Sequence, residues 1–217
     1  MSVKTSNRMS CRSLVADEAK IHTLTTTGTP TTEAGIGTIG TTSSTFSKTE
    51  YGNAILHKTV FTCTDTPITL TDTAGAGQWG GLKLYDFPEG MLCTLGATVD
   101  GVLENDGTAT IIDTFTGVIA IGTATASATD AAATLTGTEA DILQSAALTQ
   151  AVAGIANCDS QSIATALTES GARWHDGTAT AKDAYLNVAI ADDVTHTAGT
   201  ILFTGTVTVA WLLLGDN

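Results

Sequence analysis

Residues able to do acid–base or nucleophilic chemistry are scattered along the sequence. The four histidines are His22, His57, His175 and His196. A lone histidine is more often structural than catalytic, because catalysis needs a second group that activates or orients it. The sequence has no G-x-S-x-G elbow, no H-E-x-x-H motif, no Walker loop and no dinucleotide fingerprint after a strand. We therefore predict no catalytic and no cofactor-binding residues, and we expect that the protein is not an enzyme.

Residues that could bind a metal ion are also dispersed. The cysteines form no C-x-x-C pair and have no histidine at ligand spacing; they are Cys11, Cys63, Cys93 and Cys158. Residues 104–106 and 192–193 could gather oxygen ligands for calcium, but neither has the Asp/Asn spacing of an EF-hand loop. We predict exposed turn carboxylates and no metal site. We interpret the cysteines as thiols of a protein made in a reducing cytosol.

Two parts of the sequence favour a protein contact. Residues 173–176 combine Arg, Trp, His and Asp before a glycine turn, and Trp and Arg are enriched at interface hot spots. The alternative is a loop whose tryptophan folds back on the core. The N-terminus is locally basic, which favours an arm that contacts an acidic surface; the alternative is a solvated tail. The candidate partner contacts are Lys4, Arg8, Arg12, Arg173 and Trp174.

The rest of the sequence is acidic. The formal net charge is -13 at pH 7, and beyond Lys83 the only basic residues are Arg173 and Lys182. Proteins bind phosphate backbones with clustered Lys and Arg, so we expect no direct contact with nucleic acid. No stretch approaches the roughly 18 uninterrupted apolar residues of a membrane span, and no apolar signal-peptide region follows the first charges. We expect no membrane contact and synthesis in a cytoplasm.

Alternation of apolar and polar residues predicts β-strands. The clearest strand places Ile201, Phe203, Val207, Val209, Trp211 and Leu213 on one face, toward the core, and threonines on the other. Residues 81–87 form a second predicted strand, with Leu82 and Leu84 opposite Lys83 and Tyr85, before a Pro-Gly turn into residues 91–95. Further strands are predicted at residues 58–64, 67–71, 109–116, 118–125 and 185–191.

The elements assemble into an all-β protein. Residues 138–141 could cap one short helix that runs to Gln150. Residues 23–49 are rich in Thr, Gly and Ser and have few large apolar side chains, which favours an extended arm or linker. The sequence therefore predicts an extended N-terminal arm over residues 1–50 and one β-sandwich or barrel domain over residues 51–217, with at most one short helix; the resemblance described next implies the jelly-roll-like form of the sandwich.

Three segments resemble a family of tailed-bacteriophage structural proteins. They are residues 83–90 (KLYDFPEG), 183–188 (DAYLNV) and 206–216 (TVTVAWLLLGD). The resemblance covers about residues 60–217, whereas the arm departs from it. It implies a capsid cement or decoration subunit: a jelly-roll domain made in the host cytoplasm and seated on the major capsid protein at the surface of the virion.

The function expected from this resemblance is a non-enzymatic virion structural protein that binds and stabilises the shell of the major capsid protein. We expect a homo-oligomer, because sheet edges and extended arms are templates for another chain. The alternative is a phage-tail or adhesin-type receptor- or glycan-binding module, for which Trp79, Trp174 and Tyr51 are the available aromatic residues. A hydrolase would need two carboxylates or a triad brought together by the fold.

Overall fold

The computed structural model describes residues 37–52, 55–73, 77–106, 116–130, 135–152, 155–157, 160–163, 174–191 and 198–215. Within these residues the chain forms strands and two short 3₁₀ helices. The strands are β1 (Thr38–Ile39), β2 (Phe46–Gly52), β3 (Leu56–Thr73), β4 (Gly77–Asp86), β5 (Gly90–Asn105), β6 (Gly117–Gly122), β7 (Leu143–Ala147), β8 (Thr149–Val152), β9 (Ile155–Asn157), β10 (Ser160–Ile163), β11 (Trp174–Gly177), β12 (Asp183–Ile190) and β13 (Gly199–Leu213). The 3₁₀ helices are η1 (Ala128–Asp130) and η2 (Thr138–Ala140).

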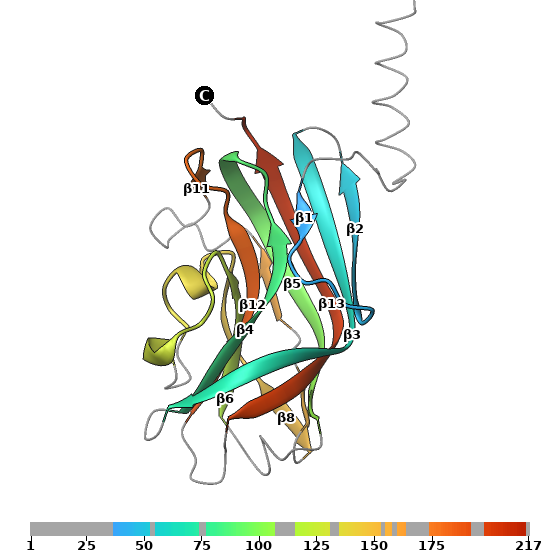
Figure 1. Cartoon of the computed structure of the whole chain (residues 1–217), viewed down its shortest axis with the longest axis vertical. Coiled ribbons are helices and arrows are strands. Elements are labelled where there is room, and N and C mark those ends of the chain that lie inside the picture. The colour runs from blue at the N-terminus through green and yellow to red at the C-terminus, as the bar shows by residue number, and fades with distance from the viewer. Residues whose placement is uncertain are drawn as a thin grey trace, which may run out of the picture.

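The strands form one curled antiparallel sheet (Figure 1). Along its main path the order is β7-β6-β12-β4-β3-β13-β5-β9-β8. The shorter strands lie off this path: β1 pairs with β4, β2 with β3, and β10 and β11 with β5. An antiparallel sheet can bury one face and leave the other to solvent, which agrees with the alternating sequence pattern.

Strand β3 joins the two halves of the curl. It pairs with β13 from Leu56 to Leu70; on its other side residues 57–63 pair with β2, and Thr71–Thr73 at its end pair with β4. Between the segments that pair with β2 and with β4, Asp65 has a φ of 49°, and the register with β13 shifts there between Phe203 and Gly205. The Thr204 hydroxyl accepts a hydrogen bond from the Asp65 N–H at 2.8 Å and donates to the Asp65 carboxylate at 3.1 Å. Such an irregularity bends a strand and increases its twist. The bend allows β3 to pair with β2 in one half of the curl and with β4 in the other.

The core lies between the two halves of the curl. On β13 the residues Ile201, Phe203, Val207, Val209 and Trp211 are at most 1% exposed, while Leu213 is half-buried against the core. Residues of the facing strands β4 and β12 belong to the same apolar cluster. The predicted inward face of β13 is therefore confirmed.

The predicted all-β class is also confirmed. The finer prediction of a jelly-roll-like sandwich stays a prediction, because the pairings define a single curled sheet in which β3 belongs to both halves.

The sheet includes residues that the sequence analysis assigns to the arm. Strand β2 pairs with β3 from Phe46 to Gly52, and β1 pairs with the end of β4. Phe46 anchors β2, because its ring is 4% exposed and stacks on Phe61 at 5.8 Å between centroids. A single large apolar residue and a backbone ladder thus fix a segment that is otherwise poor in apolar anchors. Residues 1–36, with Lys4, Arg8 and Arg12, lie outside the described residues.

The helix predicted from Thr138 to Gln150 is wrong. Thr138–Ala140 form one 3₁₀ turn, and Leu143–Ala147 form β7, which pairs with β6. The carboxylates that suggested a helix cap bind other groups: Asp141 accepts the N–H of Thr123 at 2.8 Å and Glu139 accepts that of Thr136 at 2.8 Å. A short helix is marginal by itself, so the pairing and the burial of Leu143 outweigh a local Ala-rich preference.

The other predicted strands are largely present, with different ends. Residues 58–64 and 67–71 belong to one strand, β3, and the remaining described segments fall in β4, β5, β6 and β12. Residues 109–115 lie outside the described residues. In β4 the predicted alternation is wrong at Tyr85, which is buried beside Leu84. The register with β12 shifts at this point, between Ala184 and Tyr185, so two successive β4 residues enter the core.

Replacing Trp211 by alanine should lower the free energy of unfolding by about 3–5 kcal/mol, because truncation of a large buried side chain leaves a cavity. Urea denaturation in dilute solution, followed by circular dichroism, measures this change. Trp174→Ala is the matched control, since that indole is 56% exposed; it should change the free energy by less than about 0.5 kcal/mol. Equal losses for the two variants would contradict the burial of Trp211.

Candidate functional site

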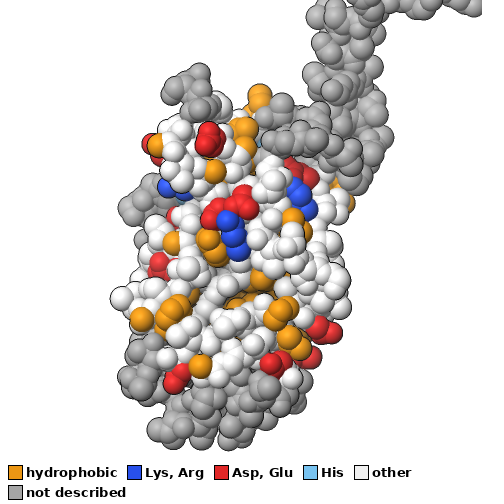
Figure 2. Space-filling model, viewed as in Figure 1, with side chains coloured by type: hydrophobic (Ala, Val, Ile, Leu, Met, Phe, Trp, Pro, Cys, Tyr) orange, Lys and Arg blue, Asp and Glu red, His pale blue; other side chains and the backbone are white. Residues whose placement is uncertain are grey.

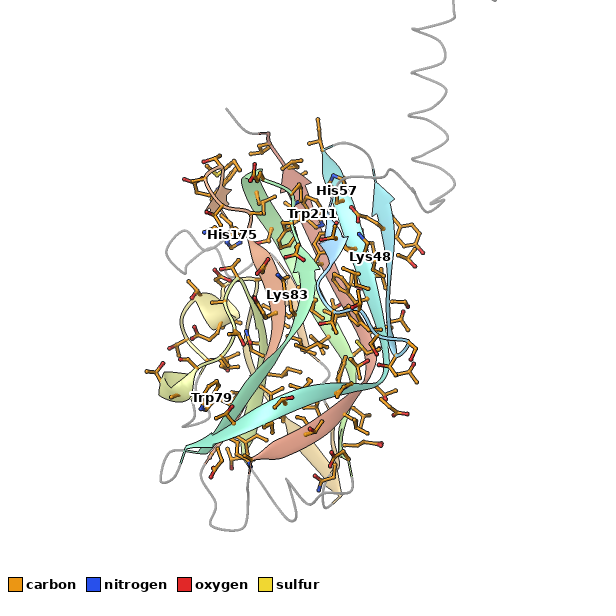
Figure 3. The ribbon with its side chains drawn as sticks, in the orientation of Figure 1. Lys48, His57, Trp79, Lys83, His175 and Trp211 are labelled. Atoms are coloured by element: carbon orange, nitrogen blue, oxygen red, sulfur yellow. The ribbon has the colours of Figure 1, made fainter. Side chains whose placement is uncertain are left out.

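A group of polar side chains lies inside the curl next to Trp211, where Figure 3 shows Lys48, His57 and Trp211 close together. We call Lys48, Glu50, His57 and Tyr85 the Glu50 cluster. The Glu50 carboxylate accepts hydrogen bonds from the Tyr85 hydroxyl at 2.7 Å and from Lys48 Nζ at 3.3 Å. Its other oxygen lies 3.2 Å from His57 Nδ1, without the alignment of a hydrogen bond. The cluster therefore ties β2 to β3 and β4 from the inside.

Aromatic rings surround the Glu50 cluster. The His57 ring stacks on Trp211 at 4.1 Å and 17°. The Trp211 indole N–H donates to the Thr59 hydroxyl at 2.9 Å, so the polar atom of this buried side chain has a partner. Tyr85 and Trp211 each contact Phe87 edge-on, both at 5.1 Å between centroids. The cluster is part of the aromatic end of the core.

Burial and hydrogen bonding set the charges in the Glu50 cluster. Burial alone would raise the pKa of Glu50, but contacts with His57, Tyr85 and Lys48 outweigh it and hold that pKa below its ordinary value. Burial, together with the hydrogen bond to Glu50, raises the pKa of Tyr85 far above its ordinary range. Lys48 Nζ lies 4.6 Å from the centroid of the Tyr85 ring and donates to the Gly37 carbonyl at 2.8 Å. At neutral pH the cluster thus contains a carboxylate, a neutral phenol and a balancing ammonium group.

A second polar group, the His175 cluster, consists of Thr94, Thr123, Asp141 and His175. His175 Nε2 lies 3.2 Å from the Thr94 hydroxyl, and Nδ1 lies 3.7 Å from the Asp141 carboxylate. That carboxylate accepts hydrogen bonds from the Thr123 N–H at 2.8 Å and the Thr123 hydroxyl at 2.7 Å. The His175 cluster therefore connects β5 and β11 to the segment between η2 and β7, across the curl.

Burial shifts both titratable groups of the His175 cluster toward their neutral forms. It raises the pKa of Asp141 to about 6, although Thr123 donates to the carboxylate and opposes the shift. Burial also lowers the pKa of His175 to about 4, and the nearby Lys182 adds to this effect. Near pH 7 Asp141 is charged and His175 is neutral.

The order of hydroxyl, imidazole and carboxylate is that of a nucleophilic triad. The geometry does not fit that chemistry. Thr94 is 3% exposed, so a substrate carbonyl has no access to its hydroxyl. The 3.7 Å between His175 and Asp141 also exceeds the length of a hydrogen bond. The arrangement joins structural elements and is unsuited to nucleophilic attack.

A third charged group lies at the surface. Lys83 Nζ binds the carboxylates of Asp86 and Asp183, the latter at 3.0 Å. Burial opposes its charge slightly, but these two contacts raise the pKa of Lys83 above its ordinary value. The Tyr185 hydroxyl also donates to Asp183, at 3.0 Å. Exposed ion pairs contribute little to stability because water screens them, so this group mainly orients the ends of β4 and β12.

Of the predicted contact residues, the structure describes only Trp174. Its indole is 56% exposed, so the alternative in which Trp174 folds back on the core is wrong. Lys4, Arg8, Arg12 and Arg173 lie outside the described residues.

Glu50 and Asp141, which lie beside His57 and His175, were not predicted as their partners from the sequence. Glu50 reaches His57 across the β2–β3 pairing, so a correct hairpin register could have found it. Asp141 meets His175 only through the curl of the sheet, and no local pattern indicates that contact.

Cys63 and Cys93 are buried, and burial raises the pKa of the Cys63 thiol to about 11. Among the described residues no group of three or more His, Cys, Asp or Glu side chains is placed to hold a metal ion. The same described residues contain no helix long and apolar enough to cross a membrane. No protein-family model, curated protein or solved structure matches this chain.

The two groups of the His175 cluster should act on stability in opposite directions as the pH changes. The pKa of His175 falls from 6.5 to about 4 on folding, so its contribution to stability is lost as the pH falls from 6.5 toward 4. The pKa of Asp141 rises from 3.8 to about 6, so stability is gained as the pH falls from 6 toward 3.8. In the native protein these contributions largely cancel.

Single substitutions should remove that cancellation. Relative to the native protein, Asp141→Asn should lose stability as the pH falls from 6.5 to 4, and His175→Gln should gain it. Each slope is at most about 1.4 kcal/mol per pH unit. Urea denaturation at a series of pH values measures the differences. Curves for both variants that run parallel to that of the native protein would show that neither group titrates as described.

Proposed function

We propose that this chain is a non-enzymatic structural subunit of a phage particle, a capsid cement or decoration protein that binds and stabilises the shell of the major capsid protein. One observation carries the proposal: the three segments that resemble the phage family meet in one part of the fold. Residues of β12 pair with β4 from Asp183 to Ile190. Trp211 of β13 contacts Phe87, and Tyr85 lies 6.0 Å from Trp211 between ring centroids.

This convergence supports a likeness of architecture. Residues of all three segments belong to one apolar cluster, and β12 pairs directly with β4; a shared fold preserves such features. The titratable groups inside the curl also support a structural role, because their hydrogen bonds join separate elements of the fold. Glu50 connects β2 to β4, and Asp141 connects the η2–β7 segment to the end of β6.

The outer surface supports contact with another protein. The outward face of the central strands carries exposed hydroxyls, among them Thr62, Thr64, Thr204 and Thr206. Figure 2 shows a second face, on which most side chains are uncharged and the charged ones gather in a few groups. Hydroxyls can hydrogen-bond to a partner without the cost of desolvating a charge, so such faces suit lying against a shell.

A second candidate is a receptor- or glycan-binding module of a phage tail or adhesin. The 56% exposure of Trp174 favours it, because exposed aromatic rings stack on sugars and anchor protein contacts. Electron microscopy of particles from the phage or prophage that encodes this chain distinguishes the two. Density over the capsid shell is the expected result, density at the tail would favour the second candidate, and absence of the chain from particles would contradict both.

Attachment to particles should survive washing at high salt. Three or four cations near the N-terminus supply little attraction at high salt, because salt screens charges beyond about 8 Å. A standard interface of about 1,600 Å² is held mainly by apolar and strand contacts, which moderate salt leaves intact or strengthens.

Retention on purified particles after low-salt and high-salt washes tests this expectation. A variant that lacks residues 1–12 tests the basic segment, and Lys4, Arg8 and Arg12 replaced together by serine is the matched control that keeps the chain length. Release by high salt, together with loss of binding in both variants, would make the basic segment the main anchor.

A further inference from the structure

Four adjacent strands align an apolar row across the outer face of the sheet. The register places Leu56 of β3 opposite Leu212 of β13, Leu212 opposite Cys93 of β5, and Cys93 opposite Trp174 of β11. Neighbours within the row are therefore about 5 Å apart between their Cβ atoms. We call Leu56, Leu212, Cys93 and Trp174 the apolar row.

The row faces away from the core. The residues that follow or precede its members in sequence, such as His57, Trp211 and Leu92, are buried on the inner face. None of the four row residues belongs to either of the two core clusters. Successive residues of a strand point to opposite faces, so the row must lie outside.

The two ends of the row are open to solvent. Leu56 is 47% exposed and Trp174 is 56% exposed. Between them Leu212 is half-buried and Cys93 is buried, and the cross-strand register keeps the four side chains adjacent. Ile55 and Leu214, at 58% and 45% exposed, add apolar surface where the Leu213 N–H donates to the Ile55 carbonyl. A contiguous apolar patch with an exposed tryptophan is typical of a protein interface.

Opposite charges stand at diagonal corners of this patch. Lys58 is two residues beyond Leu56 on β3, and Asp176 is two residues beyond Trp174 on β11; both are exposed on the outer face. Each successive pair of strands in the row is antiparallel, so β3 and β11 run in opposite directions. The lysine therefore lies on one side of the row and the aspartate on the other. Thr178 donates its hydroxyl to Asp176 at 2.7 Å, and this contact lowers the pKa of Asp176 and keeps it charged.

We propose that the apolar row is the contact surface between two copies of this chain, related by a two-fold axis that passes over the middle of the row. A two-fold contact needs a self-complementary patch. The axis exchanges the two charged corners, so Lys58 of each copy faces Asp176 of the other. The row itself contains no charged side chain, which matters because the net charge of -13 makes two copies repel each other.

The positions of Lys58 and Asp176 also determine the angle at which the strands of the two copies cross. The charged corners are three strand spacings apart across the sheet, about 14 Å, and four residues apart along the strands, about 13 Å. The line between the two charges therefore runs at about 45° to the strands. The two-fold axis lies parallel to the sheets, between them, and perpendicular to this line. Rotation about it makes the strands of the two copies cross at about 90°. Orthogonal packing is one of the two common arrangements of sheets face to face. This association is independent of any role in a virion.

Sedimentation equilibrium of the full-length chain over a wide range of concentration tests the surface. We expect a reversible monomer–dimer equilibrium. Leu56→Ser and Trp174→Ser should each raise the dimer dissociation constant about tenfold or more. Leu202→Ser, on the outer face of β13 but distant from the row, is the control and should leave it unchanged. Circular dichroism checks that every variant folds. A monomer at all concentrations, or a dimer that the two row variants do not weaken, would overturn the proposal.

Charge reversal tests the two-fold arrangement. Lys58→Asp and Asp176→Lys should each weaken the dimer, because each brings like charges together at both corners, and the double variant should restore it. Glu104→Lys makes the same change of charge as Asp176→Lys, but on β5 away from the row, and should not weaken association. If the double variant dimerises no better than the single ones, the diagonal pairing is wrong. The particle-binding experiment above is separate, so either proposal can fail while the other stands.

Discussion

The pairing of β13 with β3 on one side and β5 on the other is the constraint on which the rest of the structure depends. Both ladders run from the start of β13 to its end. Because side chains alternate between the two faces of a strand, the same register that places Trp211 in the core also turns Leu212 outward. A slip of one residue would exchange the two faces. The aromatic core and the outer apolar row are thus two consequences of one alignment.

The Glu50 and His175 clusters join the strands of the central ladder to elements of the other half of the curl, β2 to β4 and β11 to the segment between η2 and β7. Buried charges cost desolvation energy and are tolerated when several hydrogen bonds hold them. The Glu50 cluster meets that condition at β2, which pairs only with β3 among the described strands. Inward-pointing charges such as Lys48 and Glu50 are a known protection of edge strands against pairing with another chain. Such protection at the edge directs association to the outer face, where the apolar row lies.

The sequence predicted correctly those features of the fold that depend on the local alternation of apolar and polar residues. The inward face of β13 was predicted correctly because burial there follows period two from Ile201 to Trp211, apart from the half-buried Gly205. Tyr85 was misplaced because the register shift opposite Ala184 is set by pairing with β12 and leaves no local mark. Residues 138–150 were misassigned because pairing with β6 outweighs an Ala-rich helical preference. The contact between His175 and Asp141 depends on the curl of the whole sheet, so local sequence patterns could not predict it.

The composition and the register together determine how this protein can associate. Only 14% of its residues are charged and most of those charges are negative, so long-range electrostatics oppose contact between copies and give little attraction to an acidic shell. The energy of any tight contact must therefore come from apolar area and hydroxyl hydrogen bonds at short range. The outer face of the β3–β13–β5–β11 ladder offers both: threonines along most of its length and the apolar row at one end. The few charges at that end then select orientation, because a pair of opposite corners favours one arrangement and penalises the others.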